Sequence, residues 1–154
     1  MTTDKIKARH LDDEFLKLLT RKWFSHGEQI VSTCNGTNET ILFEMTGQPM
    51  EFCYGTIISS AETTGILKVY IDDENGEDIL RATGRITIGT SACILLPMAS
   101  VNGIEVITFD AKTTDAPIVR AFTIKCPNHL KVTFTPSTAS TATLSGWGIV
   151  NKLV

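Results

Sequence analysis

The stretch VYIDDENGEDIL, residues 69–80, is the densest group of potential metal ligands in the chain. A helix-loop-helix calcium loop needs carboxylates at positions 1 and 12 when glycine stands at position 6. Placing Gly76 at position 6 puts Ile71 and Ala82 at those two positions, so this type of calcium loop is excluded. Asn75–Gly76 instead predicts a two-residue hairpin with a type I′ turn, because both residues accept positive φ. Its exposed tip would carry the five acidic residues, solvated or loosely binding a cation: Asp72, Asp73, Glu74, Glu77 and Asp78.

Residues that could support catalysis are few and scattered. The only histidines are His10, His26 and His129, and no serine lies in a G-x-S-x-G elbow. Four carboxylates are expected on strands, but on different ones, with no motif that joins them across a cleft: Glu44, Glu51, Glu105 and Asp110. The sequence therefore predicts that the protein is not an enzyme and has no catalytic residues, no cofactor and no metal site.

The four cysteines are widely spaced and form no C-x-x-C pair: Cys34, Cys53, Cys93 and Cys126. Three of them lie in or beside apolar runs, where a free thiol behaves as a small buried hydrophobe. We expect buried thiols, and disulfides are the alternative.

Aromatic side chains on a wet sheet face can stack against sugars. The candidates for such ligand stacking are Tyr70 and Trp147, and the competing interpretation places them in the core.

The net charge of −3 argues against a nucleic-acid partner. No run approaches the ~20 apolar residues of a membrane helix, and residues 1–15 contain no apolar signal core. We expect synthesis in the cytoplasm and no membrane partner.

One segment has a helical period. In residues 11–27 the apolar positions recur three and four apart, with acidic residues at the start and basic residues near the end: Leu11, Phe15, Leu18, Leu19 and Trp23. Gly27 suits the position after a helix C-terminus. The pattern predicts an amphipathic helix that packs on its own domain or on a neighbouring subunit.

From Gln29 onward, short β-branched and aromatic runs alternate with turn residues every ~8–12 positions. We expect ten strands, at QIVST, TILFEMT, MEFCYGTIIS, GILKVYI, DILRATGRITI, ACILLPMA, IEVITFDA, PIVRAFTIK, LKVTFTP and ATLSGWGIV. No helical segments separate them, so a parallel sheet is excluded. The predicted fold is all-β: an antiparallel β-sandwich of jelly-roll type over residues 28–154, with an N-terminal helical arm over residues 1–27.

The closing segment VTFTPSTASTATLSGWGIV, residues 132–150, resembles the C-terminal strand pairs of accessory virion proteins of tailed bacteriophages, of the cement and decoration class. The turn-rich β body is similar to the same group. The resemblance implies a non-enzymatic structural protein of the virion, made in the host cytoplasm. Such a protein is commonly a homo-oligomer and binds the major capsid protein or other virion subunits. The residues expected to bind the partner are then those of the arm: Leu11, Phe15, Leu19 and Trp23. The alternative is a carbohydrate-binding or host-surface-binding module of fibre or adhesin type.

Overall fold

The computed structural model describes residues 22–73, 75–100, 103–110 and 123–154. Ten strands account for most of these residues, and no helix occurs among them. The strands are β1 (Trp23–Thr33), β2 (Thr40–Thr46), β3 (Met50–Ser59), β4 (Thr63–Asp72), β5 (Asp78–Ile88), β6 (Cys93–Ser100), β7 (Gly103–Asp110), β8 (Ile124–Cys126), β9 (His129–Pro136) and β10 (Thr143–Leu153). The all-β prediction is confirmed, and each of the ten predicted runs contains or overlaps one observed strand. In the described part of the chain no helix is long and apolar enough to cross a membrane.

All ten strands belong to one hydrogen-bonded sheet, ordered β1-β10-β3-β6-β7-β5-β4-β9-β2, with β8 paired to β3. The pairs are nested along the chain, because β1 pairs with β10, β2 with β9, and β4 with β5. Every pair is antiparallel except β5 and β7, which run parallel over two residue pairs. The sequence led us to expect two separate sheets, but here the β6–β7 hairpin joins the two layers into one.

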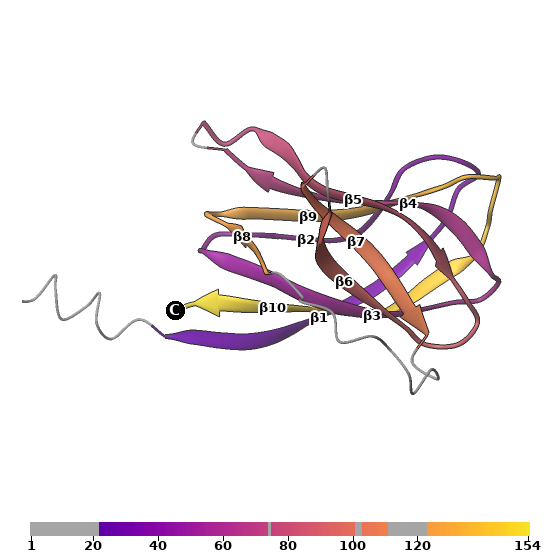
Figure 1. Cartoon of the computed structure of the whole chain (residues 1–154), viewed down its shortest axis with the longest axis horizontal. Helices are drawn as coiled ribbons and strands as arrows, with labels where there is room; N and C mark the ends of the chain where they lie inside the picture. The colour runs from indigo at the N-terminus through magenta and orange to yellow at the C-terminus, as the bar shows by residue number, and fades with distance from the viewer. Residues whose placement is uncertain (1–21, 74, 101–102, 111–122) are drawn as a thin grey trace, which may run out of the picture.

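The sheet curls until its two end strands approach each other (Figure 1). Ser32 of β1 donates a hydrogen bond of 2.7 Å from its hydroxyl to the carbonyl oxygen of Ile41 at the start of β2. One layer consists of β1, β10 and β3, and the other of β5, β4, β9 and β2.

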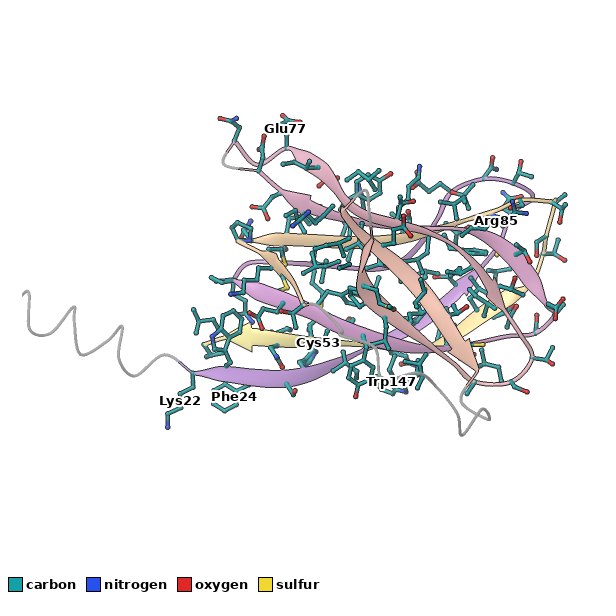
Figure 2. All side chains as sticks on the ribbon, in the orientation of Figure 1. Lys22, Phe24, Cys53, Glu77, Arg85 and Trp147 are labelled. Carbon is teal, nitrogen blue, oxygen red and sulfur yellow. The ribbon has the colours of Figure 1, made fainter. Side chains whose placement is uncertain are left out.

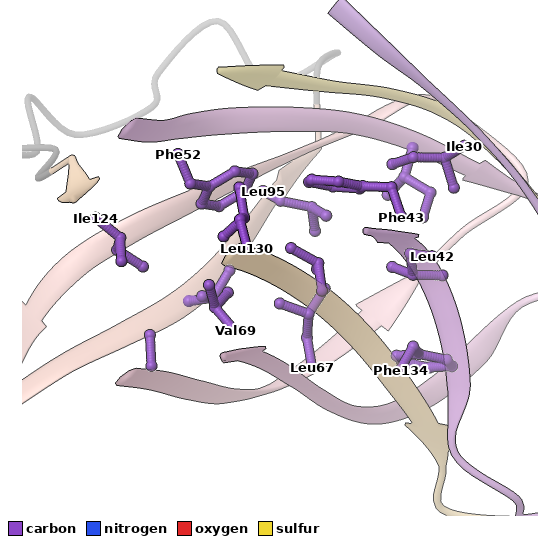
Figure 3. Close-up of a cluster of buried hydrophobic side chains, with 14 of the residues drawn as sticks. Ile30, Leu42, Phe43, Phe52, Leu67, Val69, Leu95, Ile124, Leu130 and Phe134 are labelled. Carbon is purple, nitrogen blue, oxygen red and sulfur yellow. The ribbon is translucent and has the colours of Figure 1, made fainter. Parts of the chain in front are cut away.

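The two layers enclose a continuous apolar core (Figure 3). Phe43 of β2 and Phe52 of β3 meet across it with ring centroids 6.0 Å apart. The alternation predicted for β9 is confirmed, since Leu130, Val132 and Phe134 are fully buried. Apolar side chains with no exposed surface each contribute roughly 1.5–3 kcal/mol to folding, so this core is a main source of stability.

The predicted helix over residues 11–27 is wrong where the structure describes it. Lys22 pairs with Val154 through two backbone hydrogen bonds, and Trp23 to Gly27 continue along β10 as the first half of β1. Gly27 is not a helix C-terminal residue; it lies in the strand, without positive φ. Aromatic residues spaced for one helix face are also good strand formers, and pairing with β10 decides between the two. Leu11, Phe15 and Leu19 lie outside the described residues.

The acidic hairpin forms where predicted, between β4 and β5, but its turn differs. Among the described residues positive φ occurs only at glycines, so Asn75 does not adopt the type I′ conformation, whereas Gly76 has φ 81°. The Asp73 carboxylate accepts hydrogen bonds of 2.8 Å from the backbone N–H groups of Asn75 and Glu77. These bonds, the Glu77 one foremost, hold the pKa of Asp73 below its ordinary value. The longer turn is therefore stabilised by its own carboxylate.

Candidate functional site

The central part of the outer surface of the β1–β10–β3 layer carries no charged residue and exposes several apolar side chains. In β10 the side chains of Leu144 and Val150 are buried, so Ser145, Trp147 and Ile149 lie on the opposite, outer side. The strand register sets three residues of β1 and three of β3 directly beside them. We call these nine positions the Trp147 face: Gly27, Gln29 and Val31 of β1, Ser145, Trp147 and Ile149 of β10, and Tyr54, Thr56 and Ile58 of β3.

Several large side chains of the Trp147 face are open to solvent. Val31 is 63% exposed, Trp147 49%, Tyr54 40% and Ile58 38%. Figure 2 shows Trp147 at the lower edge of the molecule, away from the core. An uncharged patch that exposes aliphatic side chains together with a Trp and a Tyr is typical of the centre of a protein–protein interface.

The motif Ser145-Gly146-Trp147-Gly148 explains how Trp147 is held outward. A Cβ at Gly146 would lie 1.9 Å from the carbonyl oxygen of Thr56, and one at Gly148 would lie 2.5 Å from the Phe43 ring. Both glycines therefore allow close packing on the inner side of β10. The side chain of Trp147, which lies between the two glycines, points to the outer side of β10, where its ring covers Gly27.

The outer surface of the other layer exposes Ile41, Ile79 and Leu80, but it also carries a cluster of polar groups that bond to one another. His129 of β9 lies between two carboxylates: Nε2 is 2.6 Å from Glu44 Oε1 of β2, and Nδ1 is 2.7 Å from Asp78 Oδ1 of β5. Lys131 donates a hydrogen bond to the second oxygen of Asp78. We call these four residues the His129 cluster: Glu44, Asp78, His129 and Lys131.

The His129 cluster links strands β2, β5 and β9 through hydrogen bonds between charged side chains. Partial burial alone would lower the pKa of His129, but the hydrogen bonds to Glu44 and Asp78 outweigh it and raise that pKa above its ordinary value. The bond from Lys131, followed by that from His129, lowers the pKa of Asp78. The imidazolium form can donate from both ring nitrogens, which suits a histidine between two carboxylates.

Tyr70, the first predicted stacking residue, lies beside this cluster and is already engaged. Its hydroxyl donates a bond of 3.1 Å to Glu39, and Lys131 Nζ lies 4.9 Å from the centre of its ring. Thr133 donates a bond of 2.6 Å to the same Glu39 oxygen. The two stacking candidates therefore lie on different layers, and only Trp147 has an open ring.

Trp23, the one predicted partner-binding residue that the structure describes, is 47% exposed. It lines a hollow of about 410 Å³ at one end of the sheet. The other lining residues come mainly from β3, β4 and the β8 region: Pro49, Met50, Ile71, Asp72, Lys125, Cys126 and Pro127. Trp23 is thus on the same layer as the Trp147 face.

All four thiols are free, and three are buried. Burial is the main cause that raises the pKa of Cys126 to about 12, and it also raises the pKa of Cys34 and of the partly exposed Cys53. A thiol with a raised pKa is a poor nucleophile at neutral pH. Within the described ranges no three His, Cys, Asp or Glu side chains converge on a possible metal position.

The acidic hairpin uses its described aspartates for structure. The Asp72 carboxylate accepts bonds of 3.0 and 2.6 Å from the backbone N–H groups of Asn128 and His129, which fixes the turn before β9. Asp73 supports its own loop and Asp78 belongs to the His129 cluster. The local sequence gave no sign of these long-range bonds, because their partners are more than 50 residues away.

Comparison with protein-family models, with curated proteins and with solved structures found no significant similarity.

Proposed function

We propose that the chain is a non-enzymatic structural protein of a virus particle, a cement or decoration protein that binds the assembled shell through protein–protein contacts. The observation that carries this proposal is the Trp147 face, nine adjacent uncharged positions with an exposed Trp and Tyr. Residues of these two types are enriched among those that dominate binding energy in protein interfaces.

The nested strand order supports a jelly-roll assignment. A jelly roll folds a long hairpin so that the first strand pairs with the last and the second with the one before it. Here β1 pairs with β10, β2 with β9, β3 with β6 and β8, and β4 with β5. The layers β1-β10-β3 and β2-β9-β4-β5, joined by the β6–β7 hairpin, follow from these pairs. Viral capsid proteins and lectins are two classes that use this fold.

The chemistry of the two outer surfaces favours binding by one of them. Groups of the His129 cluster already bond to one another, whereas the side chains of the Trp147 face would lose exposed apolar area only against a partner. Burial of that area contributes roughly 25 cal/mol per Å² before the cost of association is subtracted. Repetition over a symmetric shell would convert such a modest site into stable attachment.

The test replaces the wild-type chain in particle-producing cells by the variant Trp147→Glu. Mass spectrometry then compares the amount of this protein in purified particles that carry the wild-type or the variant chain. Wild-type protein is expected in the particles, and the variant is expected to be depleted although it folds. Thr83→Glu, at an exposed strand position on the other layer, serves as the matched control and should be incorporated normally. Wild-type protein that is absent from particles, or a Trp147→Glu variant incorporated as well as the control, would contradict the proposal.

A second candidate function is binding of a carbohydrate on a host surface, which the open Trp147 ring favours, since sugars stack on exposed indoles. Titration with a panel of oligosaccharides tests it. Binding that is lost in Trp147→Ala and kept in Tyr70→Phe would support this function. A panel without any binding would remove it.

A further inference from the structure

In the described part of the chain, the first half of β1 is a free strand edge. Lys22 and Val154 exchange two backbone hydrogen bonds, so the even-numbered residues of β1 bond to β10. The backbone N–H and C=O groups of Trp23, Ser25 and Gly27 consequently point toward the opposite edge. Among the described residues no strand pairs with β1 there, and the contact with β2 is at the other end, where Ser32 bonds to Ile41.

This edge lacks the features that usually prevent edge-to-edge pairing. Proteins block free edges with proline, lysine, bulges or short strands. The five residues WFSHG contain none of these, and β1 pairs with β10 over its whole length without a register shift. The one lysine next to them, Lys22, has an acidic residue opposite it in the pairing inferred below. All five positions are exposed, including Trp23 at 47% and Phe24 at 55%. Figure 2 shows Lys22 and Phe24 pointing away from the molecule at this end of β1.

We infer that β1 pairs antiparallel with β1 of a second copy of this chain, about a two-fold axis at Ser25. In this register Trp23, Ser25 and Gly27 of one copy face Gly27, Ser25 and Trp23 of the other, so the outward-pointing backbone groups meet. A two-fold axis makes each contact occur twice.

Charge selects this register. Lys22 stands opposite the second copy's Glu28, and the same ion pair forms again on the other side of the axis. The remaining ionisable residue of the edge, His26, already lies 3.2 Å from Glu28 of its own chain and faces the second copy's Phe24. A register shifted by two or four residues would leave Lys22 without an acidic residue opposite it.

Packing agrees with the same register. Trp23 faces the second copy's Gly27, which carries no side chain of its own and is covered by that copy's Trp147 ring, so the Trp23 indole would meet the edge of this ring. A Cβ at position 27 would lie only 3.3 Å from Trp147 Cε3, so a larger residue there would press against Trp147. Aromatic residues opposite glycine are a recurrent stabilising pair between strands. The dimer would join two Trp147 faces into one continuous surface. The pairing depends on the β1 edge alone, whether or not the partner of the Trp147 face is a virus shell.

The test is the mass of the full chain in solution, measured by light scattering over a concentration series. Two copies of the 16.8 kDa chain are expected. Lys22→Glu and Glu28→Lys, each alone, should raise the dissociation constant of the dimer about tenfold, because each sets two like charges opposite each other. The double variant should restore dimerisation. Residues 22 and 28 of one strand are about 20 Å apart, so this rescue cannot arise within one chain.

Ser25→Pro provides the second variant. Proline removes the N–H that points to the free edge and leaves the backbone β1–β10 bonds intact. It loses only the exposed side-chain bond of 3.0 Å from the Ser25 hydroxyl to Asn151, so it should give a folded monomer. Glu77→Lys, at the exposed hairpin tip, is the charge control and should remain dimeric. Thermal unfolding of each variant checks its fold. A wild-type monomer up to about 1 mM, or a dimer that tolerates Ser25→Pro, would overturn the inference. A dimer in which the double charge swap fails to rescue the single variants would overturn the register.

Discussion

The two outer surfaces of this curled sheet are built on the same alternation and have opposite chemistry. On the β5–β4–β9–β2 layer, the imidazole, ammonium and carboxylate groups of the His129 cluster satisfy one another. On the β1–β10–β3 layer, the Trp147 face carries exposed apolar side chains and no charge. The solvent-facing side of a sheet can thus have its polar groups bonded within the isolated chain, or it can leave apolar side chains exposed until a partner covers them.

The exposed hydrophobic side chains make this contrast concrete. Most of the large ones belong to the β1–β10–β3 layer or its end: Trp23, Phe24, Val31, Tyr54, Ile58, Trp147 and Val154. Scattered exposed apolar residues need no explanation, but a contiguous set on one layer points to an interface.

The largest expected effect tests how Trp147 is displayed. Gly146→Ala would place a Cβ 1.9 Å from the Thr56 carbonyl oxygen and 2.8 Å from Ile57 Cα, both main-chain atoms. Strands β10 and β3 must then separate, and we expect the free energy of unfolding to fall by about 3 kcal/mol. Urea unfolding measures this loss. Gly89→Ala is the control, because its nearest atom would be Ser91 N at 3.8 Å. Equal stability of the two variants would refute this account of the motif.

A smaller effect is expected from the hydrogen bonds of the His129 cluster, which should make the stability depend on pH. The raised pKa of His129 means that its contribution to stability is fully present below the unfolded-state pKa, near 6.5, and is lost as the pH rises through the higher folded-state value. The lowered pKa of Asp78 has the opposite sense, so its contribution is lost only as the pH falls below about 4. The free energy of unfolding of wild-type protein should exceed that of His129→Gln by a margin that depends on pH. We expect this margin to be about 1 kcal/mol larger at pH 5.5 than at pH 8.5.

Urea unfolding of wild type and His129→Gln at both pH values measures that difference. Titration of the His129 ring by NMR gives an independent check, with a pKa above the ordinary value of histidine as the expected result. If the stability difference between the two proteins is the same at both pH values, the charged imidazole does not stabilise the contact between these strands.

The smallest effect concerns the hydrogen bond that occupies Tyr70. Tyr70→Phe removes the donor to Glu39 but leaves that carboxylate bonded to Thr133. We expect a loss of about 0.5–1 kcal/mol in the free energy of unfolding, because the group is exposed and water can replace it. A loss of several kcal/mol would mean that the polar layer depends on this bond far more than its geometry indicates.

The fold could be predicted from the sequence to a large extent because local alternation and turn residues mark strands directly. The runs TILFEMT, MEFCYGTIIS and DILRATGRITI coincide with β2, β3 and β5. For residues 23–27 the apolar spacing of three and four that ends at Trp23 predicts a helix, and only the pairing with β10 shows that these residues form a strand.

The surfaces could be predicted only in part. The sequence predicts Trp147 as a ligand-stacking residue because it is aromatic. Its neighbours Val31, Tyr54 and Ile58 form a patch with it only because the strand order brings them together. The His129 cluster joins residues from β2, β5 and β9, which alternation alone cannot bring together. The local sequence determines which side of a strand faces solvent. The strand order determines which solvent-facing residues lie next to one another.

Radical footprinting of the particle-bound and the free protein tests the central claim most directly, because it reports the solvent access of each aromatic side chain. The account predicts that oxidation of Trp147 and Tyr54 falls severalfold in the particle-bound protein while oxidation of Tyr70 stays unchanged. Protection of Tyr70 with unchanged oxidation of Trp147 would contradict it and assign binding to the polar layer.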